Sequence, residues 1–210
     1  MIQIKHRETG QVLYEHDGDT LRGAKLSGTN LAHADLSGRD LSGSELKNVS
    51  LTDATLEGAD LSRTLMQASC LDRATFAGAN LAGADLTECS MLSTVLDRVR
   101  GPKVFLRYAR VVGASAKGAD LTDGDLSSAV IQADLTGAKL QRVDLRGTDL
   151  TGSDLTRADL SGAKLANCRL TDVNLIDTRL EQVVGNSILE SASGGFRVKT
   201  RKSKPWWKFW

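Results

Sequence analysis

The chain has 210 residues, with 27 Lys and Arg against 26 Asp and Glu, and its net charge at pH 7 is +1. Only 4% of the residues are aromatic, and no apolar run reaches the roughly 18 residues that a transmembrane helix needs. The opening MIQIKHRETG lacks the apolar core of a signal peptide, so we expect a cytoplasmic protein. The three Cys do not suggest a disulfide framework, and no cluster of ligands predicts a metal or another cofactor.

Residues 1–19 predict a short β-hairpin. Ile2 and Ile4 alternate with polar residues, residues 8–10 have the composition of a turn, and residues 12–14 can return as a second strand. The open end of a stacked β-structure exposes unpaired strand edges, so we expect this hairpin to cap the segment that follows.

From Leu21 onward an apolar residue, most often Leu, occupies nearly every fifth position. The spacing continues to Ile131, loses one residue, and resumes from Leu135 to Leu180. The position two residues before each apolar centre is mostly small: Ala, Ser, Thr, Val or Cys. A period of five matches neither an α-helix nor a flat strand. It predicts a narrow tube in which each five-residue unit forms one side and points two side chains inward, so that stability depends on contacts between neighbouring coils.

Several units carry the triplet Ala-(Asp/Asn)-Leu, among them those ending at Leu36, Leu61, Leu81, Leu86, Leu121, Leu135 and Leu160. With this consensus, residues 20–182 resemble the pentapeptide-repeat family. The resemblance implies an all-β fold, a right-handed quadrilateral β-helix of about eight coils, which we expect over residues 20–190. Some members of the family bind DNA gyrase and confer fluoroquinolone resistance, with an acidic rod that imitates duplex DNA.

Residues 97–117 depart from the repeat. They hold six basic residues and one acidic residue, a net charge of +5, and Gly101 and Pro102 interrupt the pattern. Because the apolar phase is kept, we expect a degenerate coil, with a protruding loop and a short helix opened by Pro102 as the alternatives. The predicted basic belt, for an anion, nucleic acid or an acidic protein, consists of Arg98, Arg100, Lys103, Phe105, Arg107, Tyr108 and Arg110. The competing interpretation is a poorly conforming coil whose Arg side chains are simply solvated.

The missing residue falls near residues 127–132, where we expect a local bulge or a small change in the direction of the rod. Cys89 and Cys168 occupy inward small positions and predict buried thiols, whereas Cys70 is expected to point outward. The repeats on either side of the basic belt are acidic, so the near-neutral total conceals an acidic rod with a basic middle.

Residues 191–210 predict a flexible Ser- and Gly-rich hinge followed by a basic, aromatic tail. The candidate binding residues of the tail are Arg197, Lys199, Arg201, Lys202, Lys204, Trp206, Trp207, Lys208, Phe209 and Trp210. Basic residues followed by Trp and Phe have the chemistry of an interfacial anchor on an anionic membrane surface, which would make the protein peripheral at the inner membrane. The alternatives are an end cap or a homodimer seam, a ligand for another protein, and a nucleic-acid contact.

The sequence favours a non-catalytic structural or interaction protein with an unidentified protein partner. His6, His16 and His33 are scattered, Asp40 and Asp60 predict a surface ladder instead of a catalytic pair, and a tube filled with Leu leaves no pocket. Direct nucleic-acid binding by the acidic rod is not expected. The alternative function is binding of DNA gyrase by DNA mimicry, which is weakened because residues 98–119 contain no Asp or Glu.

Overall fold

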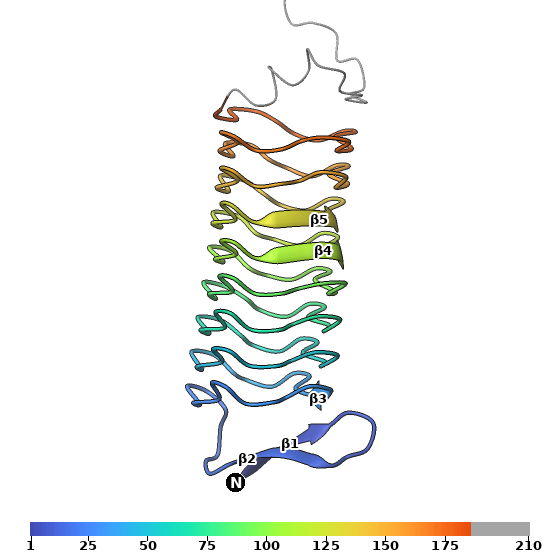
Figure 1. The fold of residues 1–210 in the computed structure, drawn as a ribbon. Helices are drawn as coiled ribbons and strands as arrows, with labels where there is room; N and C mark the ends of the chain where they lie inside the picture. The colour runs from blue at the N-terminus through green and yellow to red at the C-terminus, as the bar shows by residue number, and fades with distance from the viewer. Residues whose placement is uncertain (186–210) are drawn as a thin grey trace, which may run out of the picture.

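The computed structural model describes residues 1–185, which form a rod of stacked coils with a hairpin at the N-terminal end (Figure 1). The named strands are β1 (Ile2–His6), β2 (Val12–His16), β3 (Ala34–Asp35), β4 (Arg110–Ser115) and β5 (Val130–Asp134). No helix occurs within this part of the chain.

Parallel backbone bridges connect each coil to the next. Lys25 bridges Glu45, which bridges Leu65, so equivalent residues lie 20 positions apart and one coil takes four five-residue units. The Leu26 N–H donates to the carbonyl of Glu45 (2.8 Å), and the Glu45 N–H donates back to the carbonyl of Ala24 (2.9 Å). Each coil is therefore held by hydrogen bonds that run along the rod, as the stacked-tube prediction requires.

The two inward positions predicted for each unit are buried. Leu26 and Leu61 are fully inaccessible to solvent, and Ala34 and Ala59 stand in the small position with the same burial. Several hydroxyls in the small position donate to backbone carbonyls of the tube wall, whereas the buried Ser44 hydroxyl has no hydrogen-bond partner within residues 1–185. The Ser69 hydroxyl, for example, donates to the carbonyl of Leu46 (2.7 Å). A hydroxyl with such a partner can replace Ala inside the tube without leaving an unsatisfied polar group.

The corners explain the polar residues of the repeat. The second residue after an apolar centre has positive φ in most units, as at Gly28 (φ 73°) and Asp53 (φ 58°). The residue before the centre is often Asp, and its carboxylate accepts a hydrogen bond from the backbone two residues on. Asp60 Oδ1 accepts in this way from the Ser62 N–H (2.9 Å). Such short side chains stabilise the turn at each corner.

The N-terminal hairpin is joined to the first coil by backbone pairing. β1 pairs antiparallel with β2 and with β3, which places Lys5 opposite Asp35 and His6 opposite Ala34, in the sheet order β2-β1-β3. Ile4 is buried against the core of the rod. The first strand thus covers part of an edge that would otherwise be exposed.

Residues 97–117 form a coil within the stack. Phe105 bridges Asp85 on one side and Asp125 on the other, and Arg100 bridges Asn80 and Asp120. The segment is therefore neither a protruding loop nor a helix, the two alternatives to the degenerate coil.

One coil is shortened by a single residue. β4 and β5 pair in parallel, with Val112 opposite Gln132 but Ser115 opposite Asp134, so the register changes between these two pairs. The shift lies at the C-terminal edge of the 127–132 range expected from the Leu spacing. It is local, because Asp134 and Asp154 are again 20 residues apart.

Candidate interaction surface

The basic belt is spread over several sides of the rod instead of gathering on one side. Arg100, Phe105 and Arg110 belong to three successive units and stack in three different bridge columns. Since the four units of a coil face different directions, Arg98, Arg100 and Lys103 lie away from the residues near Arg110. The predicted site residues therefore lie on more than one side of the rod.

One corner of the rod carries Arg107 and Tyr108, with Phe105 on the side before it and Arg110 on the side after it, and we call these four residues the aromatic corner. Phe105 is 39% exposed and Tyr108 is 61% exposed. The guanidinium carbon of Arg107 lies 5.8 Å from the centroid of the Phe105 ring, and its Nε is 3.9 Å from Asp125 Oδ2. Arg107 is thus oriented both by a ring face and by a carboxylate of the next coil.

Tyr108 occupies a backbone position that suits Gly or Asn better. Its φ is +59°, and within residues 1–185 no other Tyr and no Phe or Trp has positive φ. A left-handed conformation costs a residue with a Cβ atom roughly 1–2 kcal/mol. The fold holds an exposed aromatic ring here at a cost that a Gly would avoid.

Ion pairs of Asp with Arg or Lys, all but Arg146–Asp144 between adjacent coils, neutralise part of the acidic surface. The pairs within 4.0 Å that join Asp to Arg or Lys are Arg22–Asp40, Arg73–Asp53, Arg107–Asp125, Lys117–Asp134, Lys139–Asp120, Arg142–Asp123, Arg146–Asp144, Lys164–Asp144, Arg169–Asp149 and Arg179–Asp159. The hydrogen bonds from Arg146 hold the pKa of Asp144 below its usual value, even though partial burial opposes this. These Asp carboxylates therefore lie beside a cation, which interrupts the negative surface at those positions.

Asp40 and Asp60 are neighbours through a backbone bridge, and the carboxylate of each accepts hydrogen bonds from nearby residues. Asp40 Oδ1 accepts from the Ser42 hydroxyl (2.6 Å), and Asp60 Oδ1 accepts from Asn80 Nδ2 (3.0 Å). Hydrogen bonding to the Ser42 hydroxyl is the main cause of the lowered pKa of Asp40. These contacts fit the surface ladder expected from the repeat.

His6 and His33 are not scattered, contrary to the expectation from the sequence. Their rings stack with centroids 5.0 Å apart, because β1 pairs with β3 and brings residue 6 beside the first coil. Nε2 of His33 lies 4.0 Å from Asp53, whose carboxylate is also bound by Arg73. Nothing in the five-residue period marked this stack, since it arises from pairing of the non-repeating hairpin.

Comparison with known proteins assigns the repeat. The family model for Pentapeptide repeats (8 copies) matches residues 20–38, 29–67, 69–100, 131–165 and 153–184. The chain belongs to the pentapeptide-repeat family. A sequence comparison with curated proteins finds no significant match.

One solved structure shares this fold with a TM-score above 0.5, and a second is similar to the chain in sequence. QnrB1, a plasmid-mediated fluoroquinolone resistance protein, is 21% identical over 82% of this chain and 91% of its own, with a TM-score of 0.65. HetL, a pentapeptide repeat protein involved in heterocyst differentiation regulation in the cyanobacterium Nostoc sp. strain PCC 7120, is 25% identical over 77% and 85%, with a TM-score of 0.48. The likeness to QnrB1 at this identity supports the fold.

The pentapeptide-repeat matches leave residues 101–130 uncovered, although the structure continues the stack through them. This interval contains the aromatic corner. The side chains that depart most from the family pattern are therefore displayed on a backbone that follows it.

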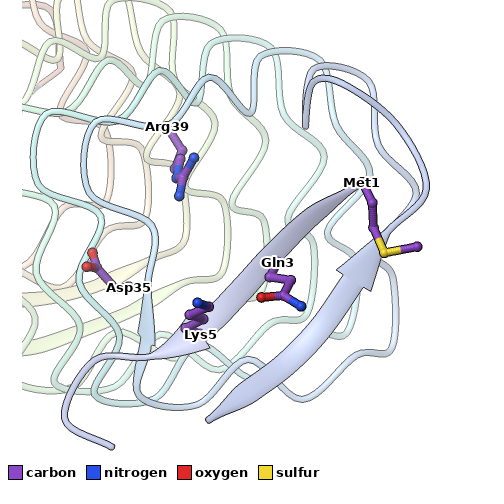
Figure 2. A pocket seen from close by; sticks show the side chains of 5 residues that line it. All are labelled: Met1, Gln3, Lys5, Asp35 and Arg39. Carbon is purple, nitrogen blue, oxygen red and sulfur yellow. The ribbon is translucent and has the colours of Figure 1, made fainter. Parts of the chain in front are cut away.

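A second feature lies at the junction of the hairpin and the first coil. A hollow of about 380 Å³ is lined by Met1, Gln3, Lys5, Asp35 and Arg39 (Figure 2). The sequence did not predict it, because the contribution of β1 depends on long-range pairing. One local indication was present: Arg39 stands two residues before Leu41, where the repeat has a small side chain.

The predicted tail residues, from Arg197 to Trp210, lie outside the described part of the chain. Within residues 1–185 no helix is long and apolar enough to cross a membrane. The same residues contain no group of three His, Cys, Asp or Glu side chains arranged to hold a metal ion.

Proposed function

We propose that this pentapeptide-repeat protein is a non-catalytic interaction protein, a right-handed four-sided rod that presents the aromatic corner to a protein partner. The observation that carries this proposal is the exposure of Phe105 and Tyr108 beside Arg107 and Arg110 on a rigid coil. Tyr, Phe and Arg are the residue types that most often supply binding energy at protein interfaces.

The chemistry of the corner favours an acidic partner surface. Arg110 and Arg107 are both exposed, and the carboxylates near Arg107 are those of Asp125, at 3.9 Å, and of Asp85 on the preceding coil. The backbone on both sides of Tyr108 is fixed by bridges to the adjacent coils, so no backbone segment has to become ordered when a partner binds. A partner that places Asp or Glu opposite the two Arg residues would gain both attraction and orientation.

The test uses the full chain as bait in lysate of the organism that makes it, followed by affinity measurement with the captured protein. Tyr108→Asn and Phe105→Ser are expected to weaken binding about tenfold or more each. Leu92→Ser and Val95→Thr serve as controls, since both side chains are half-buried apolar residues elsewhere on the rod. Equal loss in all four variants, or no loss in the first two, would contradict the proposal.

DNA gyrase binding is the second candidate function. It is supported by the fold shared with QnrB1, a fluoroquinolone resistance protein. It is opposed by the bridge column that runs Asp60, Asn80, Arg100, Asp120 and Lys139, because a duplex mimic needs continuous negative charge. The assay is gyrase supercoiling with and without a fluoroquinolone. If micromolar protein neither inhibits gyrase nor protects it from the drug, gyrase binding is excluded.

Attachment of the tail to an anionic membrane stays a prediction, as does the cytoplasmic location. Its test is co-sedimentation with anionic and with neutral liposomes, for the full chain and for a chain that ends at Gly195. If the full chain sediments with anionic but not with neutral liposomes, and the shortened chain sediments with neither, the tail is a membrane tether. Failure of both proteins to sediment would favour an end cap, a homodimer seam or a protein partner for the tail.

A further inference from the structure

The hollow beneath the first coil is built from two segments that approach from different directions. Gln3 and Lys5 come from β1, whereas Asp35 and Arg39 come from the first coil, and Figure 2 shows Arg39 reaching toward the strand that carries Lys5. The antiparallel pairing of Lys5 with Asp35 fixes the distance between the two segments. The hollow therefore has walls set by backbone structure, not by mobile loops.

Arg39 points into this space because its position lies at the end of the tube. The equivalent side chain in other units is small and faces the core, as at Ala59 one coil later. Arg39 is exposed and cannot enter the core, and the next coil position on its N-terminal side is open. The backbone of Arg39 still follows the repeat, because its carbonyl accepts a hydrogen bond from the Asp60 N–H on the next coil (2.9 Å).

The charge of the hollow is unbalanced. Among the described residues, the Lys5 amine and the Arg39 guanidinium make no hydrogen bond or ion pair, and Asp35 is the one carboxylate in the lining. One oxygen of Asp35 already accepts from the Ser37 N–H (3.1 Å). An open polar site with two unpaired cations and one engaged carboxylate attracts anions.

A second hollow, of about 250 Å³, shares Arg39 and is lined by Asp19 and Asp40. Asp40 is already bound by Arg22 (3.2 Å) and by the Ser42 hydroxyl. Arg39 forms no ion pair with either carboxylate, so its guanidinium remains available to the larger hollow.

We propose that Lys5 and Arg39 bind the phosphate group of a small molecule in this hollow. The guanidinium presents a planar pair of donors that matches two oxygens of one anion, and the amine supplies a separate point charge. Phosphate has more acceptor oxygens than a carboxylate, so it can engage the Arg39 guanidinium and the Lys5 amine through different oxygens. Binding would join the hairpin to the first coil by a contact additional to the β1–β3 pairing.

The experiment is a titration of the ¹⁵N-labelled full chain with inorganic phosphate, against chloride at matched ionic strength. Phosphate is expected to shift the amide signals of Lys5, Asp35 and Arg39 in a saturable manner. Arg39→Gln and Lys5→Gln are each expected to raise the dissociation constant about tenfold. Arg39→Lys keeps the charge but lacks the fork, and an intermediate affinity is expected.

Arg63→Gln is the matched control, since Arg63 is a cation at a rod corner outside both hollows. Unchanged phosphate affinity in this variant, together with weaker binding in the Lys5 and Arg39 variants, would support the site. Equal shifts with phosphate and with chloride would overturn the proposal. An unchanged phosphate affinity in Arg39→Gln would also overturn it, provided that the other amide signals show the variant to be folded.

Discussion

Arg73 donates two hydrogen bonds to Asp53 on the preceding coil, from Nη2 to Oδ2 at 2.6 Å and from Nε to Oδ1 at 2.9 Å. Arg142 and Asp123 repeat this arrangement further along the rod, at 2.7 and 2.8 Å. In both cases the hydrogen bonds from Arg are the main cause of the lowered pKa of the Asp carboxyl. All four residues have positive φ, so corner residues of adjacent coils are linked outside the tube.

These external pairs contribute less to stability than the core. Arg142→Gln removes both hydrogen bonds to Asp123, yet Arg142 is well exposed and its charge is screened by water and salt. We expect a small loss of stability that shrinks further in high salt, measured by urea denaturation at low and high NaCl. A loss as large as that from Leu61→Ala would contradict this ranking.

Leu61 and Leu65 test the inward assignment with the same residue type. Leu61 is fully buried, and Leu65 is half buried on the outside of the next unit. Leu61→Ala is expected to reduce the free energy of unfolding by about 2–5 kcal/mol because it leaves a cavity. Leu65→Ala should cost less than about 1 kcal/mol. Thermal denaturation of both variants checks this, and similar melting temperatures would refute the assignment.

Gly101 offers a stabilising substitution. It occupies an apolar-centre position, and a Cβ atom placed there would lie 3.3 Å from Leu121 Cδ2. Leu121 lines a cavity of about 20 Å³ and has room to move away. Gly101→Ala should therefore raise the free energy of unfolding by about 0.5–1 kcal/mol, partly by restricting the unfolded chain. Calorimetry would show a higher melting temperature, and a lower one would mean that Leu121 cannot yield.

Stability should fall in acid. The Ser161 hydroxyl, which donates to Asp159 Oδ1 at 2.6 Å, is the main cause of the lowered pKa of Asp159. A carboxyl with a lower pKa in the folded state stabilises the fold above its unfolded pKa, near 3.8, and this contribution disappears as pH falls through the folded value. Denaturant titrations from neutral pH down to about pH 3 should show the loss. Asp159→Asn should reduce the slope, and stability that rises in acid would oppose the prediction.

The thiols should differ in reactivity. Burial raises the pKa values of Cys89 and Cys168 to about 12, whereas Cys70 is partly exposed. Because the thiolate is the reactive form, an aromatic disulfide reagent at mildly alkaline pH should label Cys70 alone in the folded protein. All three should react in denaturant. Rapid labelling of Cys89 in the native state would show that the coils open locally.

The periodic part of the molecule could be predicted because its structure depends on neighbours in the sequence. The burial of Leu26 and Ala34 and the polar residue before each apolar centre, such as Asp60, follow from the five-residue period alone. The His6–His33 stack and the hollow around Arg39 could not be predicted in this way. Both depend on the pairing of β1 with β3, which joins the non-repeating hairpin to the first coil, about 30 residues later in the sequence.

The basic belt illustrates a different limit. Its residues are contiguous in sequence, and charge counting treats them as one site. In the structure, five residues of chain turn one corner, so Arg100 and Arg110 face different directions. Composition identified the segment that departs from the family, and the geometry of the coil reduced it to the aromatic corner.

Bridges between coils also determine how far apart separate surfaces lie. Four bridge steps separate Lys25, in the first coil, from Phe105, and at about 4.8 Å per step the two are roughly 19 Å apart along the axis. Because each coil contacts only its neighbours, deleting or inserting 20 residues between them would change this separation by one step and leave both ends intact. The number of coils therefore fixes the distance between the surface near the hairpin and the surface near Phe105, and with it the spacing of any two partners bound there.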